Sequence, residues 1–402
     1  MQTITRRAVV TGSLAVATGT ARAQGTPFRI GVLNDQSGFF SDAGGVGGVA
    51  AVKMAVEDFG SSVLGRPIEV LSADHQNKPD IASSIARRWF DADGVSMIVD
   101  LPNTACALPV QQLGAERKKV TLITGAAGTA LISKYCSPTS VQWTYDSYSL
   151  AQATVGPIVA AGRDTWFFIT ADYAGGIALE EGARQALMAA GGKVVGSVRH
   201  PPASTDFSSY ILQAIASGAK VIGVGSGGQD MQNVIRQAAE FGVGHDGRQQ
   251  LAVTVAFLTD IHGLGLDAAH GLLAPTAFYW DQSDAARAWS KRFYGRVKRM
   301  PTDTQAGNYS ATTCYLNAIK SANTSDAAPV MAAMRTAPIN DFMTRNGSIR
   351  ADGHMMREMF LVRVKPPAES TSEWDLCSVL STVSAEQAAF PAGQSECRLL
   401  KA

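Results

Sequence analysis

The fold is decided by two adjoining segments: FRIGVL, residues 28–33, and GGVGGVAAVKMAVEDF, residues 44–59. The first is a short apolar run, typical of a strand buried on both faces of a sheet. The second carries apolar side chains at helical spacing, which predicts an amphipathic helix. These side chains are Val46, Val49, Ala50, Met54 and Phe59. A strand followed by such a helix begins a βαβ unit, so a parallel sheet covered by helices is expected.

The same alternation continues, and it restarts near residue 166. Further strands are predicted at Ile68–Ser72, Ser96–Asp100, Val120–Thr124, Trp166–Thr170, Lys193–Val198, Lys220–Val224 and Leu251–Phe257. Helices between the later strands are predicted at about Gly175–Ala190, Phe207–Ser217 and Asp230–Phe241. A single core stops growing at about 250–300 residues, and this chain has 402. We therefore expect an α/β protein with two doubly wound, Rossmann-like lobes.

The remaining segments are too few for a third domain. Helices are predicted near Asp284–Lys298 and Thr304–Ser321, and a strand at Met359–Val364. They complete the two lobes, so the chain must cross between the lobes more than once. The tail from Lys365 is rich in Pro, Ser and Glu and is expected to wrap the surface.

The first 24 residues have the layout of a secretory signal peptide. Arg6 and Arg7 precede an apolar run from Ala8 to about Thr20, and Ala21-Arg-Ala23 supplies small residues for a signal peptidase. The apolar run is too short for a stable membrane span. The paired arginines also suit twin-arginine export, and the route stays open. We expect cleavage near Ala23 and release of a soluble chain into the periplasm.

Composition excludes several classes of function. The formal net charge is +1 and 17% of residues are charged, so neither a nucleic-acid-binding surface nor a polybasic membrane patch is expected. An odd number of cysteines leaves at least one thiol free, and the sequence by itself does not assign the pairs. The cysteines, none of which forms a CxxC motif, are Cys106, Cys136, Cys314, Cys377 and Cys397.

No catalytic or metal-binding motif is present. The six histidines are scattered, and neither a GxSxG elbow nor a GxxxxGK[ST] phosphate loop occurs. Gly223-Val-Gly-Ser-Gly-Gly228 fits GxGxxG, with Asp246 further on, which leaves an NAD-dependent enzyme as a minor alternative. We expect a protein that is not an enzyme and has no cofactor or metal.

Polar loops follow three of the predicted strands of the first lobe. They are Asn34–Phe40, Pro102–Thr104 and Thr124–Thr129, and they contain hydroxyls, small residues and two aromatic rings but few charges. Ligands bind at the carboxyl ends of strands in open α/β sheets, so these loops suit a small anion or carboxylate. The alternative is that Gly, Ser and Asn lie there because turns need them.

With these features, the sequence resembles the periplasmic substrate-binding proteins of ABC transporters. It is similar to the branched-chain amino acid (Leu/Ile/Val-binding) family, which has the type I periplasmic binding fold. The resemblance runs from about Pro27 to the C-terminus. It is carried by Ile30–Leu33 with Ser37-Gly38, Ala50–Phe59, Thr121–Ala127, Phe278–Asp281, Ala288–Phe293, Met300–Thr302 and Gln305–Ala311.

The resemblance implies two lobes that close on a small-molecule ligand by a hinge of three crossovers. It implies crossovers near Tyr145–Ser147, Thr276–Phe278 and Asp341–Thr344. An inner-membrane ABC permease is the implied partner, and the chain is expected to be monomeric. A ligand-sensing signalling module of the same fold is an alternative. The expected division is a signal peptide at 1–23, lobe 1 at 24–145 plus 278–342, and lobe 2 with the tail at 146–277 plus 343–402.

The resemblance also implies site residues. The ligand carboxylate is expected at two lobe-1 loops, and Tyr173 of lobe 2 is expected to close over the ligand. The loop residues are Asn103, Thr104, Gly125, Ala126 and Ala127. Further pocket candidates are Phe40, Tyr145, Ser226 and Phe257.

Two departures from the family pattern bear on the ligand. Amino-acid binders have an acid after the strand matched here by Leu251–Phe257, where the nearest acid is Asp260. A second-lobe aromatic is replaced by Gly225-Ser-Gly-Gly228. A buried ammonium without an acidic partner is costly. We therefore expect a carboxylate without an amine, an aromatic acid ahead of an amino acid.

The tail offers one further implication of the resemblance. Family members end in a segment similar to Ser395-Glu-Cys397. This implies a disulfide between Cys136 and Cys397 that pins the tail to the first lobe.

Overall fold

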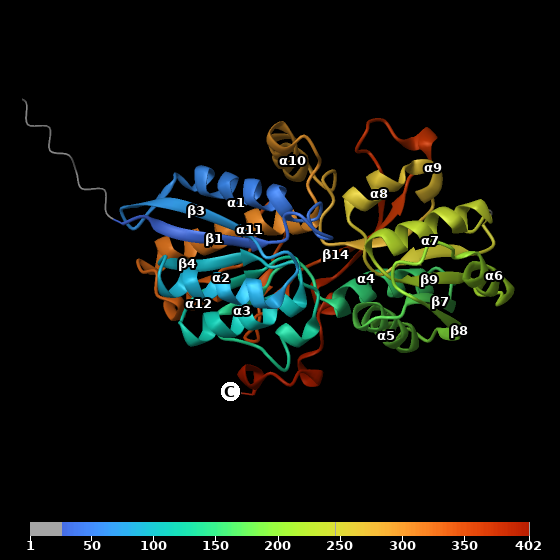
Figure 1. The fold of residues 1–402 in the computed structure, drawn as a ribbon, viewed down its shortest axis with the longest axis horizontal. Coiled ribbons are helices and arrows are strands. Elements are labelled where there is room, and N and C mark those ends of the chain that lie inside the picture. Colours follow the sequence, from blue (N-terminus) through green and yellow to red (C-terminus); the bar gives the residue numbers. More distant parts are fainter. Residues whose placement is uncertain (1–25, 246, 402) are drawn as a thin grey trace, which may run out of the picture.

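The computed structural model describes residues 26–245 and 247–401. The expected signal peptide, with its cleavage site, lies outside these residues. Within the described ranges, none of the helices combines the length and apolar character needed to cross a membrane. The chain forms two α/β lobes that lie side by side (Figure 1).

Lobe 1 is built on a six-stranded sheet in the order β2-β3-β1-β4-β5-β6. All neighbouring strands pair in parallel except β2 with β3. The strands are β1 (Phe28–Asn34), β2 (Ser62–Val63), β3 (Arg66–Asp74), β4 (Val95–Asp100), β5 (Val120–Ile123) and β6 (Ser140–Gln142).

Helices cover both faces of this sheet because its strands are apolar on both sides. The helices α1 and α11 lie on one face, and α2 and α3 lie on the other. The lobe-1 helices are α1 (Gly45–Phe59), α2 (Pro79–Asp91), α3 (Thr104–Glu116), α10 (Asp284–Val297), α11 (Asp303–Ala322) and α12 (Ala327–Thr336). A small hairpin, β12 (Ser348–Ile349) with β13 (Met355–Met356), adjoins β6.

Lobe 2 is built on a seven-stranded sheet in the order β15-β14-β11-β10-β9-β7-β8, parallel except at β11–β14 and β14–β15. Its strands are β7 (Thr165–Ala171), β8 (Lys193–His200), β9 (Val221–Gly225), β10 (Gln250–Val253), β11 (Leu273–Thr276), β14 (Met359–Val364) and β15 (Cys377–Val383). The lobe-2 helices are α4 (Ser147–Ala160), α5 (Ala174–Ala189), α6 (Ser208–Ala216), α7 (Gly228–Glu240), α8 (Leu258–Leu264), α9 (Leu266–Ala269) and α13 (Ala385–Ala388). The α/β class and the two-lobed type I fold expected from the sequence are confirmed.

One strand prediction was wrong in extent, and one strand was not predicted. The strand expected at Leu251–Phe257 ends at Val253, because the following residues leave the sheet and Phe257 occupies the N-cap position of helix α8. The tail contains a strand, β15, which the sequence analysis missed. This strand pairs antiparallel with β14 at the edge of the sheet, and its exposed side carries Leu380.

The chain passes between the two sheets at three places: from β6 to α4, from β11 to α10, and from β13 to β14. The third passage is at Arg357–Glu358, later than the expected Asp341–Thr344, because the β12–β13 hairpin stays with lobe 1. The buried Arg357 guanidinium donates to the carbonyls of Ala277 and Met343, both at 2.7 Å. One buried cation therefore joins the second and third passages.

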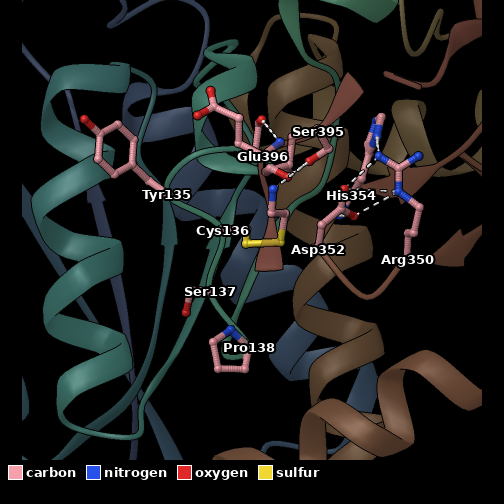
Figure 2. Close-up of a disulfide and its surroundings, with 12 residues drawn as sticks. Tyr135, Cys136, Ser137, Pro138, Arg350, Asp352, His354, Ser395 and Glu396 are labelled. Atoms are coloured by element: carbon pink, nitrogen blue, oxygen red, sulfur yellow. Dashed lines mark hydrogen bonds and ion pairs between the residues drawn. A yellow bond between two sulfur atoms is a disulfide. The ribbon is translucent and has the colours of Figure 1, made fainter. Parts of the chain in front are cut away.

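The tail returns from lobe 2 to lobe 1. Cys397 is bonded to Cys136, which precedes β6 in lobe 1 (Figure 2). The tail is also held by the Arg350 side chain, which donates to the Phe390 carbonyl at 2.8 Å. Because β15 belongs to lobe 2, the disulfide closes a fourth, covalent connection across the hinge.

Removing this disulfide should lower stability. In the double variant Cys136→Ser/Cys397→Ser, the unfolded chain gains conformational freedom, so the free energy of unfolding should fall by about 2–4 kcal/mol. Urea denaturation followed by circular dichroism measures the change. Cys314→Ala, which alters a thiol outside the bond, is the matched control. Equal urea midpoints for wild type and the double variant would contradict a stabilising bond.

Candidate functional site

Three loops of lobe 1 meet at the carboxyl edge of its sheet. They follow β1, β4 and β5, which are neighbours in the strand order. The order reverses between β1 and β4, since β3 lies on one side of β1 and β4 on the other. Such a switch point is where α/β sheets bind ligands.

The side chains of Asn103 and Thr104 brace these loops. The Asn103 side-chain oxygen caps α3 by accepting from the Ala105 N–H at 2.8 Å. The Thr104 hydroxyl accepts from the Gly128 N–H at 3.0 Å, which ties the loop after β4 to the loop after β5. Asn103 therefore fixes the start of α3, and Thr104 joins the loops after β4 and β5. The Thr104 hydroxyl acts as an acceptor in this bond, so its own proton is left to donate.

The loop after β5 presents backbone donors. The Ala126 carbonyl accepts from Gln142 at 2.7 Å, and the Ala127 carbonyl accepts from the Ser147 N–H at 2.7 Å. Within the described part of the chain, the N–H groups of Thr104, Ala126 and Ala127 donate to no protein acceptor. Three backbone donors thus stand free at the N-terminus of α3 and the adjoining loop.

Glycine is required at position 125 because the two loops touch there. A Cβ on Gly125 would lie 2.7 Å from the Pro102 Cα. The Gly125 carbonyl accepts a hydrogen bond from the Tyr145 hydroxyl at 3.1 Å. Burial raises the pKa of the Tyr145 hydroxyl well above its usual range. Tyr145, at the first passage between the lobes, therefore holds the loop after β5 in place through its hydroxyl.

The loop after β1 carries two aromatic rings, Phe39 and Phe40, in edge-to-face contact with centroids 4.8 Å apart. The buried Asp35 carboxylate accepts from the N–H groups of Gly38 and Phe40 at 2.8 and 2.9 Å, which fixes the loop. Phe40 is half-buried, whereas Phe39 is exposed at the loop tip.

Phe39 reaches lobe 2. A Cβ on Gly228, which opens α7, would lie 1.9 Å from the Phe39 ring, so the ring lies against bare backbone. The other two glycines of the GxGxxG pattern also accommodate side chains, since a Cβ on Gly223 or Gly225 would meet Phe168 or Thr170. Packing accounts for all three glycines, and Asp246 lies outside the described residues.

The expected lobe-2 contacts have differing surroundings. Ser226 is fully buried, and its hydroxyl has no hydrogen-bond partner among the described residues. Tyr173 is the N-cap residue of α5 and is 43% exposed. Phe257 is half-buried against the lobe-2 core, and its N–H donates to Asp260 at 2.9 Å. Asp260 is thus engaged in capping α8, and burial raises its pKa.

The structure brings Asn103, Thr104, Gly125, Ala126 and Ala127 together at one edge of lobe 1. The Tyr145 hydroxyl bonds to the Gly125 carbonyl of this group. A cavity of about 880 Å³ lies elsewhere, between the second passage, the segment Asp341–Arg345 and strands β14 and β15, and no expected site residue lines it. In the described ranges, His, Cys, Asp and Glu side chains form no group of three that could hold a metal ion.

Sequence reasoning missed a buried polar group beneath these loops. It consists of Asn34, Asp100, Thr124 and Asn308, joined by hydrogen bonds. A charged residue at the end of the apolar strand Val95–Asp100 is the one local signal. Asn308 comes from α11, so its participation depends on the tertiary fold.

The fold and this edge define a two-lobed solute-binding protein, and comparison with known proteins gives the family. Residues 27–371 match the model of the family described as periplasmic binding protein. The chain belongs to that family, whose members are extracytoplasmic solute-binding proteins of ABC transporters. Among curated proteins it is 24% identical over 193 residues to Leu/Ile/Val-binding protein homolog 6 of Brucella abortus, which covers 48% of this chain. The match spans about half (49%) of that relative's length.

Solved structures match over nearly the whole chain. A periplasmic binding protein from Burkholderia mallei is 43% identical with a TM-score of 0.85, covering 93% of this chain and 99% of that one. A branched-chain amino acid ABC transporter periplasmic ligand-binding protein from Burkholderia xenovorans is 40% identical with a TM-score of 0.89, covering 93% and 100%. A Rhodopseudomonas palustris solute-binding protein in complex with 3,4-dihydroxybenzoic acid shares the fold at 19% identity, with a TM-score of 0.79 and coverage of 90% and 98%.

Tyr145→Phe should destabilise the protein without altering its shape. The change leaves the buried Gly125 carbonyl without its donor, so the free energy of unfolding should fall by about 1–3 kcal/mol. Urea denaturation measures this, with Tyr135→Phe, at a half-exposed tyrosine, as the matched control. If both variants unfold at the wild-type midpoint, Tyr145 does not brace the loop.

Proposed function

We propose that this protein captures a small carboxylate between its lobes and presents it, as a monomer, to an inner-membrane ABC permease. The observation that carries the proposal is the set of free N–H groups of Thr104, Ala126 and Ala127. Free donors at a helix N-terminus favour an anion, because the helix dipole adds to the hydrogen bonds. The donors come from two adjacent loops, so one carboxylate group fits between them.

An aromatic acid is favoured over an amino acid by the groups that face this edge. The Phe39 ring supplies an apolar surface where lobe 1 meets Gly228 of lobe 2. Asp260, the acid nearest to the position where amino-acid binders have one, is already bonded to the Phe257 N–H. A bound ammonium without a carboxylate partner would cost several kcal/mol. The complex of a protein of the same fold with 3,4-dihydroxybenzoic acid supports this ligand class.

One observation favours an amino acid as the second candidate. Asp172 directly follows β7 and precedes Tyr173, and it is exposed. Among the described residues, none bonds to its carboxylate. Asp172 could therefore face a ligand ammonium when the lobes close. The Burkholderia xenovorans relative, a branched-chain amino acid ABC transporter periplasmic ligand-binding protein, is consistent with this alternative.

Calorimetry with benzoate, benzamide and leucine separates these ligands. Benzoate should bind, and benzamide should bind at least about tenfold more weakly, because it lacks the negative charge that strengthens hydrogen bonds from N–H groups. Leucine should bind more weakly than benzoate because its ammonium lacks a paired acid. Tight leucine binding without benzoate binding would refute the aromatic preference.

The variant Asp172→Asn distinguishes the two candidates further. It should leave benzoate affinity unchanged, since a carboxylate ligand needs no acid in lobe 2. If instead the wild type binds leucine and this variant does not, the amino acid is the ligand. Asp267→Asn, a matched change at α9 of the same lobe, controls for general effects of charge.

A further inference from the structure

Asp100 ends strand β4 in an unusual backbone conformation. Its φ is +92°, and Leu101 follows at +55°. Residues other than glycine seldom adopt positive φ, and such a conformation costs about 1–3 kcal/mol unless its surroundings enforce it. Asp100 is fully buried, so the enforcing contacts are internal to lobe 1.

The Asp100 side chain is held by two amides from distant parts of the chain. Its Oδ2 accepts from Asn34 Nδ2 at 2.8 Å and from Asn308 Nδ2 at 2.7 Å. Asn34 ends β1, and Asn308 belongs to α11. The Asn308 side-chain oxygen accepts from the Thr124 hydroxyl at 2.5 Å. The carboxyl is thereby linked to the first residue of the loop after β5.

The glycine-rich start of α1 makes room for this carboxyl. A Cβ on Gly48 would lie 2.3 Å from Asp100 Oδ2, and one on Gly44 would lie 3.1 Å from Oδ1. No other residue fits at Gly48 without displacing the carboxyl. Asp100 Oδ1 has no hydrogen-bond partner in the described ranges. The positive end of the helix dipole lies beside it and favours a negative charge.

The backbone of Asp100 joins the two donor loops. Its carbonyl accepts from the Thr124 N–H at 2.9 Å and from the Gly125 N–H at 3.3 Å. The chain after Asp100 runs directly into Pro102–Thr104, the first donor loop. The loop that it holds, Thr124–Ala127, is the second. A single residue therefore sets the position of both.

We propose that Asp100 is a positioning residue for the ligand, which fixes the two anion-binding loops and places an ionisable carboxyl beneath the bound carboxylate. This inference rests on the proposed carboxylate site. Asp100 touches no ligand itself and acts through Asn308, Thr124 and the Gly125 N–H. Its charge, however, is close enough to those loops to alter the affinity for an anion.

The position of the carboxyl makes ligand affinity depend on pH. Burial raises the pKa of Asp100 to about 7, although the hydrogen bonds from Asn34 and Asn308 oppose this. The side chains bonded to the carboxyl, Asn34 of β1 and Asn308 of α11, are neutral, and the adjoining residues of α1 are glycines. The Tyr145 hydroxyl, whose pKa lies well above this range, is affected by the charges of both Asp100 and Asp303. Burial raises the pKa of Asp303 to about 6, so the carboxyl that titrates near pH 7 is that of Asp100. Below about pH 7 the carboxyl is neutral; above it, the carboxylate repels a bound anion. Affinity should fall as pH rises through 7.

The test compares wild type with Asp100→Asn, Asp100→Ala and the matched control Asp74→Asn, at the end of β3, which β1 separates from β4. Benzoate is titrated calorimetrically from about pH 5.5 to about pH 8.5. In wild type and Asp74→Asn, affinity should fall above pH 7, by up to about tenfold per pH unit. In Asp100→Asn the fall above pH 7 should be absent. An unchanged pH profile in Asp100→Asn would overturn the proposal.

Hydrogen exchange tests the same role without a ligand. The Thr124 and Gly125 amides should exchange faster in Asp100→Ala than in wild type or in Asp74→Asn. Should wild type bind neither benzoate nor leucine, the proposed function fails, and amide exchange alone decides the positioning role. Exchange at wild-type rates in a folded Asp100→Ala would overturn it. If Asp100→Ala does not fold, exchange is measured in Asp100→Asn instead. Exchange of the Thr124 and Gly125 amides no faster than in wild type, together with an unchanged pH profile of benzoate affinity, would then overturn the proposal.

Discussion

Parallel pairing of β1 with β4 and of β4 with β5 is the constraint on which the candidate site depends. Parallel strands end at one edge of a sheet, so loops far apart in sequence emerge side by side. The start of α3 then supplies N–H donors at that edge, and Asp100 lies below it. An anion-binding surface follows from backbone geometry, and the side chains of Asn103 and Thr104 hold that geometry in place.

The relation between the lobes depends on a few buried polar contacts at the hinge. Arg357, at the third passage, bonds to the carbonyl of Ala277 at the second passage and to that of Met343. Asp146, which caps α4 after the first passage, lies 3.4 Å from His354 of the β12–β13 hairpin. The tail adds α13 over the same region and ends in the Cys136–Cys397 bond. The tail therefore covers the passages between the lobes, and its disulfide adds a covalent link to lobe 1. The lobes also touch where Phe39, in the loop after β1, lies against Gly228 at the start of α7.

Much of the architecture could be predicted because hydrophobic periodicity is local. The strand Met359–Val364 has its predicted bounds, and α1 begins one residue after its predicted start. The prediction failed where a segment leaves its sheet for a tertiary reason. At Leu251–Phe257 the apolar run continues, yet Phe257 lies at the N-cap position of α8 instead of extending the strand. Strand β15 was missed because it is stabilised by pairing with β14, which its own pattern does not reveal.

For the site, the sequence determined which loops follow the strands and that they are rich in small, uncharged residues. Local composition sufficed, because turns and helix starts require those residues. Only the tertiary structure decided that Thr104 bonds to Gly128, that Asp260 accepts a hydrogen bond from the N–H at the start of α8, and that the Phe39 ring lies against Gly228. These contacts join residues separated along the chain, and a buried charge such as that of Asp100 finds its partners only when the lobe is assembled.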